Sequence, residues 1–147
     1  MNTVNVANSS DRDKIENFLM KAGLSVDGVL EEGNPFFIMK DEQEKIVGTL
    51  GIEIQAKKGL LRSLAIAPAV PEQDLFTLFE TARMDSRERG LSTIYLATNK
   101  ATSVALFQFL GFELLDASAL QSELSHFTYL AKLENMQSTF LMKCELK

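Results

Sequence analysis

Glu53 lies in a strand-like run whose two faces carry different kinds of side chain. Residues 46–54 alternate, and one face holds Val47, Thr49, Gly51 and Glu53. A carboxylate among small residues is a candidate general base, because partial burial raises its affinity for a proton. Thr49 and Gly51 would then form the floor of a substrate groove. The alternative is that Glu53 is a solvated carboxylate near the end of the strand.

A helix is expected to begin at Pro71 with an acidic first turn. Helix starts that follow a strand often bind phosphate through free N–H groups, but the run PEQDLF has no glycine. One carboxylate and one phosphate charge 4 Å apart repel by about 1 kcal/mol in water and about 4 kcal/mol at an effective dielectric of 20. Glu72 and Asp74 would therefore oppose a diphosphate, and Phe76 would plug its path. The alternative is that the carboxylates only stabilise the helix start.

Few other side chains could transfer protons or bind metal. The chain has one histidine, His126, and two tyrosines, Tyr95 and Tyr129, which could donate a proton only if the fold brought them to the site. Otherwise the tyrosines are core or surface residues. The single cysteine, Cys144, is expected to be a small core residue. No His/Cys cluster is present, so no metal site is expected.

The composition argues against several classes of partner. The chain has 147 residues, 46% of them hydrophobic, which predicts a single domain over residues 1–147. A net charge of −5 argues against nucleic acid and anionic membranes, which need clustered Lys and Arg. No apolar run is long enough to span a bilayer, and the first residues lack the pattern of a signal peptide. These features predict a cytoplasmic protein without disulfides.

Strand and helix patterns alternate in the order β-α-β-β-β-α-β-α-β-β, which predicts an α/β fold with a mixed sheet. Ser9 or Ser10 is the expected cap of the first helix, and glycines follow each of the three helices. The Phe and Leu residues of 105–112 are expected in the core. The expected strands are 3–7, 35–40, 46–54, 60–67 (central in the sheet), 91–98, 112–115 and 138–146, and the expected helices are 8–23, 71–89 and 101–110.

Several runs in this order resemble the GNAT superfamily of acetyl-CoA-dependent N-acetyltransferases. They are GLLRSLAIAP, a helix ending in RERG, LSTIYLATN and ALFQFLGFELL, and the resemblance extends over residues 3–146. LLRSLAIAP and the tail HFTYLAKLENMQSTFLMKCEL are most similar to the branch of arsenic-resistance acetyltransferases. The resemblance implies a GNAT-like acyl-CoA N-acyltransferase fold and acetyl transfer from acetyl-CoA to an amine of a small molecule or amino acid.

The resemblance also implies a cofactor site. The main chain of Leu64, Ala65 and Ile66 would bind the pantetheine arm of acetyl-CoA. The following turn, which in the family carries a basic residue and glycines around the pyrophosphate, is degenerate here. Asn99 matches a position that contacts cofactor or water, or else it caps the next helix. The degenerate turn holds Glu72, Gln73, Asp74, Leu75 and Phe76.

The resemblance also implies catalytic and acceptor-binding residues, but fewer positions of this sequence match the family there. Many relatives have, at the position of Phe107, a tyrosine that protonates the leaving thiolate; Tyr95 is a weak substitute. Glu53 would be the base, with Thr49, Gly51 and His126 on the acceptor side. Two functions remain open: an acetyltransferase, or a catalytically inactive GNAT-fold binding or regulatory module, as a homodimer in either case. A donor that lacks a diphosphate is a third alternative.

Overall fold

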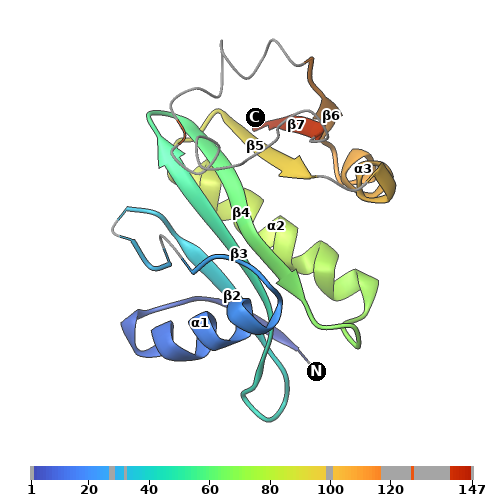
Figure 1. The fold of residues 1–147 in the computed structure, drawn as a ribbon. Coiled ribbons are helices and arrows are strands. Elements are labelled where there is room, and N and C mark those ends of the chain that lie inside the picture. The colour runs from blue at the N-terminus through green and yellow to red at the C-terminus, as the bar shows by residue number, and fades with distance from the viewer. Residues whose placement is uncertain are drawn as a thin grey trace. The chain divides into compact units, whose positions relative to one another are not determined.

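The computed structural model describes residues 2–26, 29–31, 33–98, 101–116, 127 and 140–146. Its elements follow the predicted order, which confirms the α/β fold class (Figure 1). The strands are β1 (Thr3–Val6), β2 (Phe36–Lys40), β3 (Ile46–Gln55), β4 (Lys58–Ile66), β5 (Thr93–Thr98), β6 (Glu113–Leu114) and β7 (Phe140–Glu145); the helices are α1 (Arg12–Lys21), α2 (Glu72–Glu88) and α3 (Ala101–Phe109), with a 3-10 turn at Ser9–Asp11.

The strands form one mixed sheet in the order β1-β2-β3-β4-β5-β7-β6. β4 is therefore central, as its apolar sequence predicted. β4 and β5 are parallel, whereas β1–β2, β2–β3, β5–β7 and β6–β7 pair antiparallel. The register of β4 with β5 covers only Lys58, Gly59 and Leu60, and β4 runs on for six more residues.

Residues 1–52 and 63–85 form one compact unit. Its core joins α1 to the strands, because Ile15 and Leu19 of the helix are fully buried and cluster with Phe36 and Ile38 of β2. Burying large aliphatic and aromatic side chains of this kind stabilises the fold by about 1.5–3 kcal/mol each. Leu78, Phe79 and Ala82 of α2 are also buried, as the helical stripe predicted, while Leu75 is half-buried.

The start of the first helix differs from the prediction. Asn8, and neither serine, is the capping residue: its side chain accepts a hydrogen bond from the N–H of Ser10 at 2.9 Å. The Asp11 carboxylate accepts in return from the N–H of Asn8 at 3.0 Å, which completes a capping box around the 3-10 turn. The prediction failed because α1 begins only at Arg12, after that turn.

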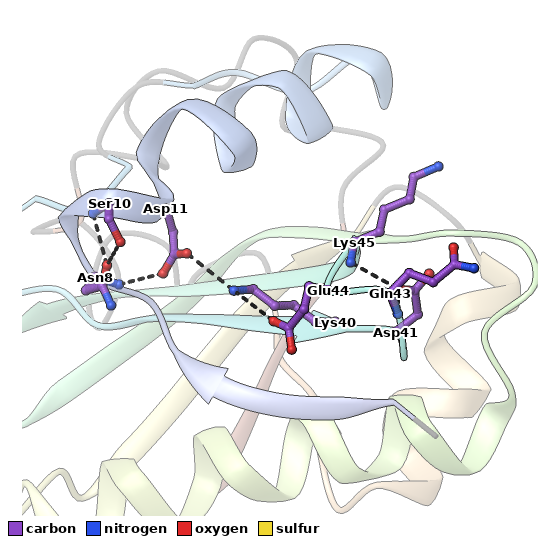
Figure 2. A network of polar contacts seen from close by, with 8 residues as sticks. All are labelled: Asn8, Ser10, Asp11, Lys40, Asp41, Gln43, Glu44 and Lys45. Atoms are coloured by element: carbon purple, nitrogen blue, oxygen red, sulfur yellow. Dashed lines mark hydrogen bonds and ion pairs between the residues drawn. The ribbon is translucent and has the colours of Figure 1, made fainter.

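A lysine at the end of β2 ties the hairpin to the capped turn. Lys40 Nζ lies 3.5 Å from Asp11 Oδ1 and 3.8 Å from Glu44 Oε2 (Figure 2). Both Lys40 and Asp11 have largely buried side chains, so the ion pair is screened less than a surface pair. Asp41 Oδ1 accepts from the N–H groups of Gln43 and Lys45, which builds the turn that leads into β3.

Residues 53–62 and 86–147 form the second compact unit. Leu60, Tyr95, Phe127 and Leu141 make up a buried cluster in it. Cys144 is a buried thiol, as predicted.

In α3 and the residue that follows it, Phe107 and Leu110 are buried, and so is Phe112. Phe109, however, is 77% exposed and Leu106 is half-buried, so the prediction that the Phe and Leu residues of 105–112 are core was wrong for Phe109 and holds only in part for Leu106. Two residues along a helix correspond to a rotation of about 200°, which turns Phe109 away from the side that Phe107 buries.

Candidate functional site

A left-handed residue interrupts β4 before its last three positions. Ser63 has φ 55°, a conformation in which a residue other than glycine is uncommon. The change in backbone direction falls beyond the part of β4 that pairs with β5. It therefore lies immediately before Leu64, Ala65 and Ile66, whose main chain the resemblance assigned to a pantetheine arm.

Thr49 of β3 holds this residue. Its hydroxyl donates a hydrogen bond to the carbonyl oxygen of Ser63 at 2.9 Å, and Thr49 is 0% exposed. The Thr49 hydroxyl thus already has a partner in the protein. Thr49 is therefore a candidate for a role that acts through Ser63, and not for direct contact with a substrate.

Two neighbours of Thr49 also fix the end of β4. The N–H of Ala67 donates to the carbonyl oxygen of Val47 at 2.9 Å. A Cβ at Gly48 would lie 3.1 Å from Ile66 Cδ1 and 3.3 Å from Met39 Cβ, which is closer than most real contacts. Glycine at this position therefore allows β3 and the end of β4 to pack closely.

The face of β3 with Thr49, Gly51 and Glu53 is buried. Gly51 is buried, and Glu53 is only 3% exposed. The alternative of a solvated Glu53 is therefore wrong, whereas the groove over this face stays a prediction. Alternation identified which residues share the face, but it could not show that both faces of the strand are covered. A buried carboxylate on a strand remains a candidate general base.

The first turn of α2 begins one residue later than predicted. Pro71 is the capping residue, since its carbonyl oxygen accepts from the N–H groups of Asp74 at 3.0 Å and Leu75 at 3.3 Å. Asp74 is engaged by another side chain: Asn2 Nδ2 donates to Asp74 Oδ2 at 2.9 Å. Glu72, by contrast, is exposed.

The same turn has backbone N–H groups that could bind a diphosphate, but it has no basic side chain. The run from Ala67 to Phe76 contains two carboxylates and no basic residue. Phe76 is 43% exposed, so its ring is partly in solvent. The end of β4 thus fits an amide-containing pantetheine arm, whereas the helix start fits a diphosphate only through its backbone.

The two aromatic positions proposed near the reacting thioester are core residues. Tyr95 is 1% exposed and packs against Phe127, with ring centroids 6.1 Å apart. Phe107 is 6% exposed and meets Phe112 edge-on at 6.1 Å. Core packing, the alternative weighed for Tyr95, therefore describes its surroundings.

Three residues of interest, Asn99, His126 and Tyr129, lie outside the described residues. Within the described ranges, no three His, Cys, Asp or Glu side chains are grouped closely enough to hold a metal ion. Those ranges likewise contain no helix with the length and apolar character that crossing a membrane requires.

Sequence reasoning missed two structural features of this region, the left-handed Ser63 and the contact of Asn2 with Asp74. Neither has a local signature, because serine is an ordinary strand residue and Asn2 is 72 positions from its partner. Both depend on which segments lie side by side in the fold.

Comparison with known proteins gives a relative in sequence and similar solved structures. No protein-family model matches the chain. The uncharacterized protein YwlB from Bacillus subtilis (strain 168) is 32% identical over 139 residues, which cover 94% of this chain and 93% of YwlB. A GNAT-family acetyltransferase from Staphylococcus aureus Mu50 has a similar structure, with a TM-score of 0.78 at 19% identity over 100% of both chains.

A second solved structure that resembles this chain includes a ligand. It is N-acetylglutamate synthase from Neisseria gonorrhoeae in complex with coenzyme A and N-acetyl-glutamate. It matches with a TM-score of 0.76 at 18% identity, over 100% of this chain and 35% of the synthase. Likeness at these identities shows the fold, and the predicted GNAT-like acyl-CoA N-acyltransferase fold is confirmed.

Proposed function

The chain belongs to the family of YwlB and has the GNAT fold, and on that premise we propose that it is an N-acetyltransferase. It transfers the acetyl group of acetyl-CoA to the amine of a small molecule or amino acid. The observation that carries the proposal is the end of β4: Leu64, Ala65 and Ile66 follow the left-handed Ser63 and lie beyond the pairing of β4 with β5.

The main chain of these three residues would bind the arm of the donor. A pantetheine arm contains two amides, and an extended strand offers N–H and C=O groups at matching intervals. When bound, acetyl-CoA supplies an acetyl thioester. This interaction depends on backbone direction, so it tolerates the apolar side chains found here.

Glu53 would accept the proton that the amine loses as it attacks. It is the buried carboxylate of β3, with 3% exposure, and a carboxylate is one of the side chains that act as general bases. The family's usual tyrosine is replaced by the buried Phe107, so the thiolate would leave without a side-chain acid at that position.

The helix start would bind the diphosphate weakly. Its free N–H groups attract a phosphate, while Glu72 and Asp74 oppose it. The contact with Asn2 already satisfies one oxygen of Asp74, and Glu72 is exposed enough to turn into solvent. We therefore expect acetyl-CoA binding with a modest affinity.

Two observations favour a second function, a catalytically inactive GNAT-fold binding or regulatory module. The acidic helix start and the loss of a tyrosine at Phe107 are both expected if catalysis has been lost. Either proposal includes four further expectations. The protein belongs to the arsenic-resistance branch and is cytoplasmic. Residues 1–147 form a single domain, and two copies form a homodimer.

Calorimetric titration of the purified protein with acetyl-CoA decides between the two functions. Micromolar binding, followed by acetyl transfer to at least one member of a panel of amines and amino acids, supports the acetyltransferase. A dephosphorylated coenzyme A and a truncated pantetheine thioester are the controls for the contribution of the phosphates. No heat up to millimolar ligand, confirmed by a thermal-shift assay, would favour the inactive module.

A further inference from the structure

Ser63 needs an external constraint to keep its conformation. The left-handed region is unfavourable for residues other than glycine, and Ser63 is found there inside a strand, with φ 55°. Such a residue persists only where its surroundings hold it, and it often aims neighbouring groups at a ligand. The groups that follow Ser63 are the main chain of Leu64 to Ile66.

The hydroxyl of Thr49 supplies that constraint. It is fully buried, and it donates to the carbonyl oxygen of Ser63 itself, not to a neighbouring peptide. A buried carbonyl that loses a hydrogen-bond donor loses stabilising free energy. The hydrogen bond therefore favours the left-handed form over the extended form of Ser63.

Two contacts that follow Ser63 along the chain limit how the end of β4 can respond. Ala67 is bound to Val47 at 2.9 Å, and the side chain of Ile66 packs over Gly48. Three successive residues of β3 thus hold β4 from Ser63 to Ala67. Within this short span, the bond from Thr49 acts on the left-handed residue itself.

We propose that Thr49 is a positioning residue for the acyl donor. Its hydroxyl holds Ser63 in the left-handed form and so directs the main-chain groups of Leu64 to Ile66 toward the pantetheine arm. This inference rests on the proposed acetyltransferase function. It replaces the expectation that Thr49 contacts the acceptor amine.

The test compares Thr49→Val, which removes the hydroxyl at nearly constant volume, with Thr49→Ser, which keeps it. Thr93→Val is the matched control, because Thr93 is also a buried strand threonine and its hydroxyl donates to Glu145 at 3.1 Å in the other compact unit. Hydrogen–deuterium exchange of residues 63–67 is measured in the free protein. Calorimetry then gives the Kd of coenzyme A and of acetyl-pantetheine, which has no diphosphate.

Faster exchange at residues 63–67 is expected in Thr49→Val alone. The Kd of both ligands should rise by about tenfold in this variant, since one buried hydrogen bond is lost, and Thr49→Ser should restore most of the affinity. Thr93→Val should change neither quantity. If the affinities for coenzyme A and acetyl-pantetheine fall equally, the substitution acts on binding of the pantetheine arm that both ligands share.

Unchanged exchange in Thr49→Val would overturn the proposal, whether or not the wild-type protein binds coenzyme A. A loss of affinity for coenzyme A but not for acetyl-pantetheine would also overturn it. If the wild-type protein bound neither coenzyme A nor acetyl-pantetheine, the proposed acetyltransferase function would be wrong, and so would the proposed role of Thr49 in donor binding. Faster exchange in that case would leave Thr49 with only a structural role.

Discussion

The side-chain amide of Asn2 donates a hydrogen bond to the carboxylate of Asp74 at 2.9 Å. It joins the residue before β1 to the first turn of α2, across 72 positions of sequence. Asp74 is therefore held by a side chain from another element, and its own N–H is bound to Pro71. The acidic helix start is in this respect a tertiary contact as well as a local preference.

Replacing Asn2 by alanine should destabilise the protein. Asn2→Ala removes the donor from a partly buried carboxylate, and we expect the free energy of unfolding to fall by about 1 kcal/mol. Urea denaturation measures the change. Asn5→Ala is the control, because Asn5 is an exposed residue of β1. Equal stability of the two variants would show that the Asn2 contact contributes nothing.

Removing the two carboxylates at the start of α2 should strengthen binding of coenzyme A. Glu72→Gln together with Asp74→Asn keeps the side-chain sizes, and we expect the Kd to fall by about tenfold at low salt, with a smaller gain at high salt. Calorimetry at two ionic strengths measures this.

The control for that experiment is Glu88→Gln, which changes the charge at the exposed last residue of the same helix. It should leave the Kd unchanged. A double variant that stays folded but binds no better would show that both carboxylates already point away from the diphosphate.

Much of the fold followed from local patterns. Alternation marked β3, and the apolar run of β4 predicted its central place in the sheet. The glycine stops after the helices were also confirmed: Gly90 and Gly111 have φ 83° and 103°. These features depend on neighbours in sequence, which is why a single chain reveals them.

The site was predicted less completely. The pattern named Thr49 and Glu53 as residues of one face but left their burial open, since burial depends on what covers the strand. It assigned the helix cap to serines, because Asn8 forms a capping box with Asp11 only once the 3-10 turn precedes α1. Ser63 was overlooked because its backbone conformation is set by Thr49 of a neighbouring strand.

Glu53→Gln should lower the rate of acetyl transfer. If the carboxylate accepts the amine proton, we expect kcat to fall by about 10²-fold or more, with little change in the affinity for coenzyme A. Steady-state kinetics and calorimetry on the same preparation separate the two effects. Glu88→Gln should keep the wild-type kcat. A Glu53→Gln enzyme with normal kcat would remove Glu53 from the mechanism.

Introducing at position 107 the tyrosine that the GNAT resemblance implies should not supply an acid. Phe107 is 6% exposed and packs against Phe112, so Phe107→Tyr places a hydroxyl among apolar rings. We expect a loss of about 1–3 kcal/mol in the free energy of unfolding and no gain in kcat. Phe109→Tyr, at a position that is 77% exposed, should leave stability unchanged. Higher kcat in Phe107→Tyr would show that the ring does reach the thioester.

The left-handed conformation of Ser63 predicts which substitutions β4 tolerates. Ser63→Gly and Ser63→Val both lose the hydroxyl, but only glycine adopts φ 55° without strain. We expect the free energy of unfolding of Ser63→Val to be about 2 kcal/mol lower than that of Ser63→Gly, because a β-branched residue is especially unfavourable in the left-handed region.

At Leu64, which has no positive φ, the order should be reversed, since valine suits a strand and glycine weakens it. Urea denaturation of the four variants gives both differences. If valine were the better residue at both positions, Ser63 would be extended in solution, and the hydrogen bond from Thr49 would no longer have a left-handed residue to hold.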